Sequence, residues 1–386
     1  MTSAPIAGRE HLRQRARQLA KDKIAPLADE MERTSVPSAA LCDLYREEGW
    51  LDAFVPAEFG GTQFSGEDWY LLNEEVARVS VASALLMEFG STAAVQFAPA
   101  EQHARLFPDV VGKVGAFAVT EPDAGSDILA LRATIEDKGG YYLLNGQKCL
   151  INNGGIAEVM TVVATVEPGS GRSGIRLLLV DPAAAGVRRS AEKQRMGLRG
   201  ASIVDLSFDN VEIPATHLIG GEDGYGIMKC LFCHSRTMVA AMAIGNAQAA
   251  MERALEYCLH RKQFGRPVYD NQAVSFMIAD MAIGIEAARD LALHAVRSVR
   301  AGEEEAPVLA AKAKVFASNT GARVTADAVQ CLGGAGYLQE NAVERRMRDA
   351  AALQITNGTN QMHQNSVARA LAKQCLAARP TEVGHG

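Results

Sequence analysis

An amide-rich stretch near the C-terminus, QITNGTNQ at residues 354–361, has the polar side chains of a binding site but no ionisable group. Asparagine and glutamine amides donate and accept hydrogen bonds, yet they have no useful basicity. Asn357 could therefore orient a ligand but could not remove a proton from it. Whether chemistry is expected here depends on the rest of the chain.

Two segments in the middle of the chain carry groups that suit a polar ring or a phosphate. In AVTEPDAGSD, residues 118–127, an expected strand runs into a turn that contains Gly125 and the hydroxyls of Thr120 and Ser126. Backbone N–H groups and hydroxyls at such a bend bind polar ring edges and anions. NGQKCLINNGG, residues 145–155, is expected to return beside it as a hairpin.

Two later segments suit a nucleotide. RKQFG at 261–265 offers a guanidinium fork for a pyrophosphate in Arg261 and a ring for stacking in Phe264. QCLGGAGY at 330–337 contains Gly333 and Gly334, which permit close approach of the backbone to a ligand. The sequence GGAGY follows a helix rather than a strand, so it is not a dinucleotide-binding fingerprint.

Other motifs lack the context that they require. CLFCH at 230–234 matches the c-type haem attachment pattern, but it lies in an expected helix of a chain with no export signal. The eight histidines include no HExxH and no pairs at metal-ligand spacing, so we predict no metal site.

The elements that must position these residues come in three blocks. Helical periodicity covers 8–105, β-rich runs separated by glycine, proline and asparagine turns begin near residue 114, and helices return after Gly224. Segregated blocks of helix and strand predict an α+β fold rather than a doubly wound sheet. We expect domains at 1–113, 114–222 and 223–386.

Composition excludes several partners. A net charge of −6 argues against nucleic acid and anionic membranes, which attract basic surfaces. The longest apolar run, 238–251, is too short to span a bilayer. No signal peptide is recognisable at the N-terminus, so we expect a cytoplasmic protein. The odd number of cysteines, seven, favours reduced thiols over a disulfide framework.

Taken in order, the segments KIAPLADEME, VPAEFGG, AVTEPDAGSD, RKQFG, QCLGGAGY and VERRMRDA resemble the acyl-CoA dehydrogenase family of flavoproteins. The resemblance covers nearly the whole chain. It implies an N-terminal helical domain, a middle β-barrel and a C-terminal four-helix bundle. It also implies FAD bound between barrel and bundle, with part of the site supplied by a neighbouring subunit of a homotetramer or dimer.

The resemblance assigns roles by position. Flavin contacts fall on Phe117, Val119, Thr120, Ser126, Leu150, Ile151 and Asn152. Contacts to the adenine and pyrophosphate, across the subunit boundary, fall on Arg261, Phe264, Gln272, Gln330, Gly333 and Gly334, with Thr359 and Gln361 completing the nucleotide site. Substrate contacts fall on Ser126, Arg236, Gly358 and Arg369.

The chain departs from the family at the catalytic base. The family removes the proton α to a thioester with a carboxylate, usually a Glu at the position of Asn357 here. A minority of members place that Glu just before an arginine, where this chain has Ser235. Leu150 matches a tryptophan that flanks the flavin, Asn152 a threonine near N5, and Cys233 an aspartate on the CoA side. The last difference makes a carrier-protein thioester as suitable as CoA.

Four explanations of the missing base are open. The base has moved, with Glu88 the main candidate and His234 and Cys233 weaker ones. The chemistry needs no α-proton base, as in a flavin oxidase or oxygenase of specialised biosynthesis. The chain is the non-catalytic subunit of a mixed oligomer. Deamidation at the Asn357–Gly358 pair creates an aspartate, which we regard as a laboratory artefact.

We expect α,β-dehydrogenation of an acyl thioester, carried on CoA or an acyl carrier protein, with electrons passed to an electron-transfer flavoprotein. The acyl group, the carrier and the electron acceptor are not determined by the residues.

Overall fold

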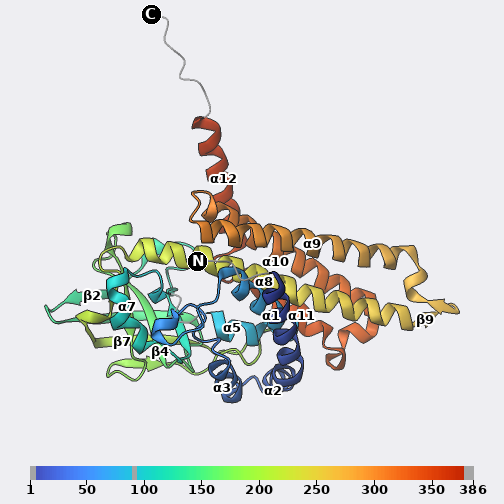
Figure 1. Ribbon diagram of the computed structural model, residues 1–386, viewed down its shortest axis with the longest axis horizontal. Coiled ribbons are helices and arrows are strands. Elements are labelled where there is room, and N and C mark those ends of the chain that lie inside the picture. Colours follow the sequence, from blue (N-terminus) through green and yellow to red (C-terminus); the bar gives the residue numbers. More distant parts are fainter. Residues whose placement is uncertain (1–5, 89–93, 378–386) are drawn as a thin grey trace, which may run out of the picture.

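The computed structural model describes residues 6–88 and 94–377; the side chains of Ile6, Ala7 and Glu88 lie outside this description. The described part of the chain begins and ends with helices, and a sheet forms its middle (Figure 1). The strands gather at one end of the molecule, and three long helices extend from them toward the other end.

The N-terminal part is helical. Its helices are α1 (Ile6–Leu19), α2 (Ala25–Thr34), α3 (Ala39–Glu47), α4 (Gly66–Ala77), α5 (Val81–Glu88) and α7 (Ala100–Leu106), with a π-helical turn at Ala20–Ile24 between α1 and α2. Helix α4 begins at a capping box, in which Ser65 Oγ accepts from the Asp68 N–H and the Asp68 carboxylate accepts from the Ser65 N–H. Because α4 packs against α8, it is buried along nearly its whole length.

The middle part is one eight-stranded sheet. Its strands are β1 (Gly115–Ala118), β2 (Thr134–Asp137), β3 (Tyr141–Asn152), β4 (Val159–Thr165), β5 (Ile175–Val180), β6 (Val187–Arg189), β7 (Ile203–Pro214) and β8 (Leu218–Ile219). They are ordered β6-β7-β3-β2-β4-β5-β8, and β1 pairs with β4 in parallel. The expected barrel is not closed, because the end strands β6 and β8 are only three and two residues long and do not pair with each other.

The C-terminal part is built on three long helices, α8 (Gly224–His260), α9 (Gln272–Ala301) and α10 (Ala306–Leu332). A hairpin of β9 (Lys262–Gln263) and β10 (Arg266–Pro267) joins α8 to α9 at the far tip of the molecule (Figure 1). Helix α11 (Val343–Leu353) packs on α8 and α10, and α12 (Asn360–Ala377) projects from the body.

Short 3-10 helices link these elements. They span Ala57–Phe59, Phe107–Asp109, Ile128–Ala130, Gly171–Gly174, Ala215–His217, Val268–Asp270, Gly333–Tyr337 and Gln339–Asn341.

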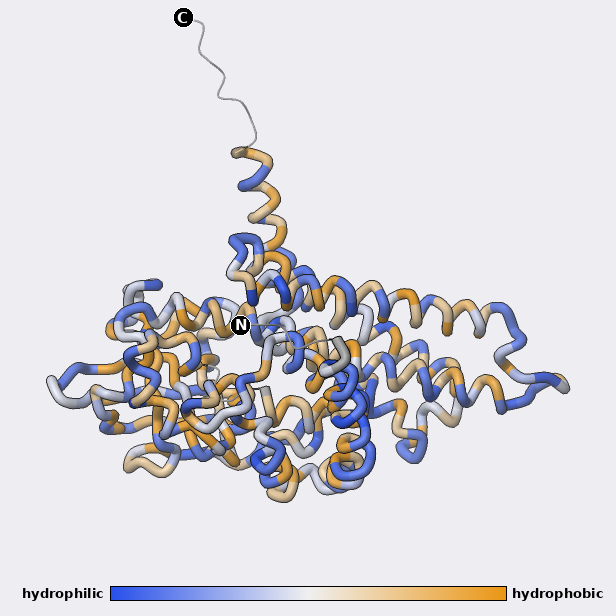
Figure 2. The backbone as a smooth tube through the Cα atoms, viewed as in Figure 1, coloured by the Kyte–Doolittle hydropathy of each residue, from blue (hydrophilic) through white to orange (hydrophobic). Residues whose placement is uncertain are grey.

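Helix α8 is the core helix that joins the parts. It is long and apolar enough to cross a membrane, but 78% of its most apolar window is buried inside the protein. Its alanine and methionine side chains form one hydrophobic core with α4, α5, α9 and α10. Two further cores lie on the two faces of the sheet. Hydrophobic residues are dense in the strands, whereas α1 is largely hydrophilic (Figure 2).

Candidate functional site

The two neutral positions singled out by the sequence touch each other. Asn357 lies in the loop between α11 and α12 with φ of +54°, a left-handed conformation that asparagine tolerates better than most residues. Its Nδ2 donates a hydrogen bond to Ser235 Oγ on α8. Packing therefore brings together two side chains that are 122 residues apart in the chain.

A buried lysine holds the loop that carries Asn357. Lys314 Nζ, on α10, donates to the carbonyl oxygens of Gln354 (3.1 Å) and Gly358 (2.9 Å) and to Asn360 Oδ1 (2.8 Å). Three acceptors match the three N–H donors of an ammonium group. Burial and the nearby charge of Arg236 lower the pKa of Lys314 to about 7.

A histidine holds the same loop from the other side. His363 Nε2, on α12, lies 3.0 Å from the carbonyl oxygen of Asn357. Because a carbonyl only accepts, Nε2 carries the proton in this contact. Burial, followed by the charges of Arg236 and Lys314, lowers the pKa of His363 to about 4, so the ring is neutral at pH 7. Gly358 has φ of +89°, and a Cβ there would lie 3.0 Å from the His363 ring.

Arg236 follows Ser235 on α8 and is half-buried. Its Nε is buried without a hydrogen-bond partner. Its guanidinium carbon lies 6.0 Å from the centroid of the Phe232 ring, at the limit of a cation–π contact. In the part of the chain that the structure describes, no carboxylate forms an ion pair with it. Burial lowers the pKa of the guanidinium.

The sheet meets α8 at this point. The rings of Phe117, on β1, and Phe232 pack edge to face with centroids 6.0 Å apart. The turn after β1 is fixed to β3 by a hydrogen bond from Cys149 N to Thr120 O (2.8 Å). Lys148 Nζ donates to Glu121 Oε1 (2.7 Å) and to Val119 O (2.9 Å), and both ionic side chains are buried. Burial lowers the pKa of Lys148 to about 8.

Strand β3 is irregular where the sequence places flavin contacts. Its pairing with β7 shifts register between Lys148 and Ile151, and Leu150 in this bulge has φ of +57°. The Leu150 side chain is 60% exposed, and its N–H donates to Asp205 Oδ1 (3.0 Å). Asn152 Nδ2 is buried without a partner. An exposed leucine and an unpaired amide on one strand fit a flat ring with a polar edge.

The residues expected at the adenine and pyrophosphate lie elsewhere in the chain. Phe264, in the β9–β10 hairpin, is 99% exposed. Arg261, Gln272, Gln330, Gly333 and Gly334 are also exposed and come from the same end of the helices. Gln330 lies sixteen positions after Lys314 on α10, which at the rise of an α-helix is about 24 Å. Within one chain these residues and the Asn357 region do not form a single site.

The remaining predicted residues are placed as follows. Thr359 Oγ1 accepts from Met362 N (3.3 Å) where α12 begins, and Gln361 is exposed in its first turn. Arg369 is exposed further along α12, away from Asn357. Ser126 is exposed in the turn after β1. The side chain of Glu88 lies outside the described residues.

Sequence reasoning missed Lys314 and His363 as the supports of the Asn357 loop. A signal for Lys314 exists, because it shares a helix face with the buried residues Ala310, Ala317 and Gly321. A lysine on an apolar face predicts a buried amine with nearby acceptors. His234, named as a weak candidate, is buried with Nε2 unpartnered, and burial lowers its pKa to about 4.

Comparison with known proteins identifies the family. Models of the acyl-CoA dehydrogenase N-terminal, middle and C-terminal domains match residues 7–113, 116–211 and 222–372. The chain belongs to the acyl-CoA dehydrogenase family.

Relatives span the whole chain. Cyclohex-1-ene-1-carbonyl-CoA dehydrogenase of Syntrophus aciditrophicus is 37% identical, and the match covers 93% of this chain and 89% of that protein. The structure of butyryl-CoA dehydrogenase from Megasphaera elsdenii is 32% identical with a TM-score of 0.91, and the match covers 96% and 100% of the two chains. The FAD complex of PigA is 26% identical with a TM-score of 0.90, covering 97% and 100%.

This protein is therefore an oxidoreductase and a flavoprotein, and its cofactor is FAD. The residues present fit that cofactor. Leu150 is exposed in the bulge of β3 and the buried Asn152 Nδ2 has no hydrogen-bond partner, so this strand offers an apolar surface and a free donor to such a group.

Proposed function

We propose that this chain oxidises an acyl thioester at its α and β carbons, with the thioester carried on CoA or on an acyl carrier protein. The observation that carries this proposal is the convergence of Asn357, Ser235 and Arg236 beside the contact between β1 and α8. This is where the family resemblance places the α carbon of the substrate.

The proposed flavin contacts come from the sheet. Phe117, Val119 and Thr120 would border the isoalloxazine on one side, and Leu150, Ile151 and Asn152 would border it on the other. Bound FAD supplies an acceptor for the hydride that leaves the β carbon. Ser126, exposed in the turn after β1, would contact the thioester.

The proton at the α carbon is the difficulty for this chemistry. Neither the Asn357 amide nor the Ser235 hydroxyl is basic at neutral pH. A positioned general base contributes typically about 10²–10⁴ in rate. We therefore propose that this member lacks the usual catalytic Glu and either uses a base from another position, such as Glu88, or oxidises thioesters slowly.

The test is restoration of the carboxylate. The purified flavoprotein is mixed anaerobically with a panel of acyl-CoA and acyl-carrier thioesters, and bleaching of the flavin absorbance is followed in wild type, Asn357→Glu and Asn357→Gln. We expect Asn357→Glu to accelerate bleaching by about 10²–10⁴, and the neutral control Asn357→Gln to leave the rate near that of wild type. A wild-type rate as fast as that of Asn357→Glu would show that the base lies elsewhere, and Glu88→Gln would then be the next variant.

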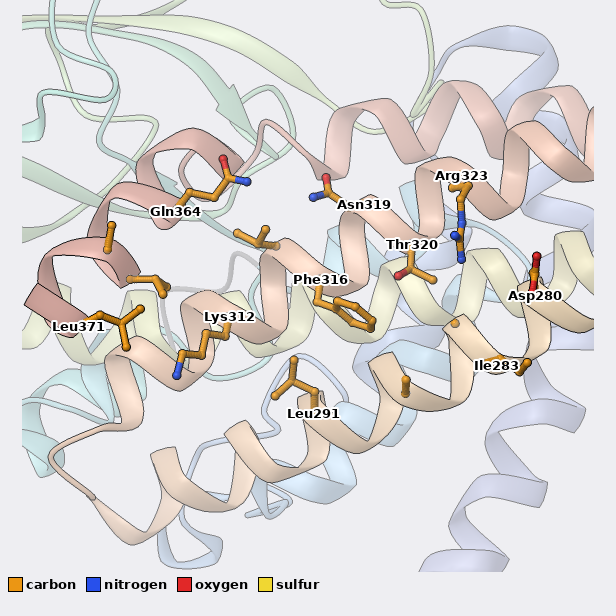
Figure 3. A pocket seen from close by; sticks show the side chains of 15 residues that line it. Asp280, Ile283, Leu291, Lys312, Phe316, Asn319, Thr320, Arg323, Gln364 and Leu371 are labelled. Carbon is orange, nitrogen blue, oxygen red and sulfur yellow. The ribbon is translucent and has the colours of Figure 1, made fainter.

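The exposed nucleotide residues support a homo-oligomer, a tetramer or a dimer. Because Phe264 and Gln330 lie far from Leu150 in one chain, we propose that they hold the FAD of a neighbouring subunit. A groove of about 960 Å³ between α9, α10 and α12 is lined by apolar side chains that include Leu291, Phe316 and Leu371 (Figure 3). Such a surface is typical of a subunit contact. Electrons would then pass to an electron-transfer flavoprotein.

A flavin oxidase or oxygenase is the second candidate. The exposed Leu150 and the unpaired Asn152 amide favour it, because they leave room and a polar group for a different ligand. Oxygen uptake by the reduced protein, in the presence of a reductant and no thioester, would support this candidate. A non-catalytic subunit is less well supported, since this chain keeps both groups of flavin residues.

A further inference from the structure

The Asn357 region is rich in hydrogen-bond donors and lacks a negative charge. Asn357 Nδ2 has two N–H groups and uses one of them on Ser235. The Ser235 hydroxyl accepts that bond, so its own proton is free to donate elsewhere. Arg236 adds a guanidinium whose Nε is buried without an acceptor. Asn357, Ser235 and Arg236 therefore all offer hydrogen-bond donors, and none of the three carries a negative charge.

The described residues around Asn357 and Arg236 do not supply a negative charge either. Lys314 donates to three neutral oxygens, and His363 donates to the Asn357 carbonyl. No ion pair within residues 8–87 and 94–377 includes Arg236 or Lys314. The charges of Arg236 and Lys314 repel each other, and both lower the pKa of His363. Among the described residues, no carboxylate therefore neutralises the positive charge of the half-buried Arg236.

Arg236 is half-buried, and the cost of leaving its buried Nε without an acceptor is relieved best by a carboxylate, which can accept two hydrogen bonds from a guanidinium. The aromatic neighbour Phe232 offers only a weak contact at 6.0 Å. An amine or an uncharged alkyl group would leave the guanidinium unsatisfied. A ligand that brings its own carboxylate would satisfy Arg236, Ser235 and Asn357 together.

We propose that the acyl group of the substrate carries a carboxylate, placed within a few carbons of the thioester and bound by Arg236 with Ser235 and Asn357. This inference rests on the proposed function, because that function makes the substrate an acyl thioester. It goes beyond that function because it names the chemical class of the acyl group. A carboxylate of the substrate would stand where the family places the carboxylate of the protein.

The experiment measures binding rather than turnover. The FAD-loaded protein is titrated with two non-oxidisable thioethers of equal length, one ending in a carboxylate and one in the isosteric carboxamide. Each is made on CoA and on pantetheine, the arm shared with carrier proteins. Perturbation of the flavin absorbance gives Kd. We expect wild type to bind the carboxylate about 10- to 100-fold more tightly than the carboxamide, the range of a charged hydrogen bond.

Variants of Arg236 and Asn357 test whether these residues cause the preference for the carboxylate. Arg236→Gln should bring the ratio of the two Kd values close to 1, and Arg236→Lys should keep part of it. Arg33→Gln, which removes an exposed arginine of α2, is the matched control and should keep the whole preference. If Arg236→Gln does not fold, Asn357→Glu provides the second test, because its own carboxylate would neutralise Arg236 and abolish the preference.

Two results would overturn the inference. One is a wild-type ratio near 1 on both carriers, which is the result expected if Arg236 binds a phosphate of the nucleotide instead. The other is a preference that survives in both Arg236→Gln and Asn357→Glu. Bleaching of the flavin tests the proposed function separately. If thioesters bind with the carboxylate preference but never bleach the flavin, dehydrogenation is excluded and the carboxylate-binding site stands.

Discussion

At the scale of single residues, Lys314 links the site to stability. Its pKa of about 7 in the folded protein is below its ordinary value of 10.5, mainly because the amine is buried. Between these two pH values the unfolded chain holds a proton that the folded chain has released. The contribution of this group to the free energy of unfolding therefore rises with pH across that interval.

The Lys314→Met variant tests this sign. The substitution leaves the oxygens of Gln354, Gly358 and Asn360 without their donor, so we expect a loss of stability of about 1–3 kcal/mol. We also expect the difference in free energy of unfolding between wild type and variant to grow as pH is raised from 7 to 9. Urea titrations at several pH values measure it. A difference that stays constant over this interval would mean that the three oxygens keep the amine charged in the folded protein.

At the scale of elements, the bulge of β3 stores strain in an exposed residue. Leu150 adopts φ of +57° with a side chain that is 60% exposed, so its backbone strain is not offset by burial. Leu150→Gly removes strain of about 1–3 kcal/mol and costs part of that in the entropy of the unfolded chain. We expect thermal stability of the FAD-free protein to be raised or unchanged, and retention of FAD to fall.

A second leucine provides the matched control for this bulge. Leu198 has nearly the same φ, +52°, but its side chain is buried. Leu198→Gly should therefore destabilise by several kcal/mol, since buried leucine contacts are worth about 2–5 kcal/mol. Thermal melts of both variants, together with the absorbance ratio of flavin to protein, check the pair. Equal destabilisation of the two would contradict the role of strain at Leu150.

At the scale of the whole molecule, the proposed subunit contact lies at the far end of the helices. Phe264 is 99% exposed, so Phe264→Ala removes no contact within the subunit and should leave its fold unchanged. We expect loss of bound FAD and a smaller assembly. Val36→Ala, at an exposed apolar residue between α2 and α3, is the control and should change neither. Light scattering and flavin absorbance after gel filtration measure both; full FAD content in a Phe264→Ala assembly of wild-type mass would exclude the proposed contact.

The sequence predicts much of the fold because its signals are local. Helical periodicity over 8–105 and after Gly224, with turn-rich β runs between them, predicts the three blocks that the structure shows. Closure of a barrel is not a local property. It depends on whether β6 and β8 are long enough to pair, and they are not.

The candidate site divides in the same way. The sequence by itself determines that the chain is a member of this family and that residues 354–361 carry no base. Only the tertiary structure decides that Asn357 contacts Ser235, that Lys314 supports the loop of Asn357, and that Arg236 Nε is buried without a hydrogen-bond partner. These contacts join residues far apart in the chain, so they depend on how α8, α10 and the α11–α12 loop pack. No local pattern specifies which charges that packing leaves unpaired.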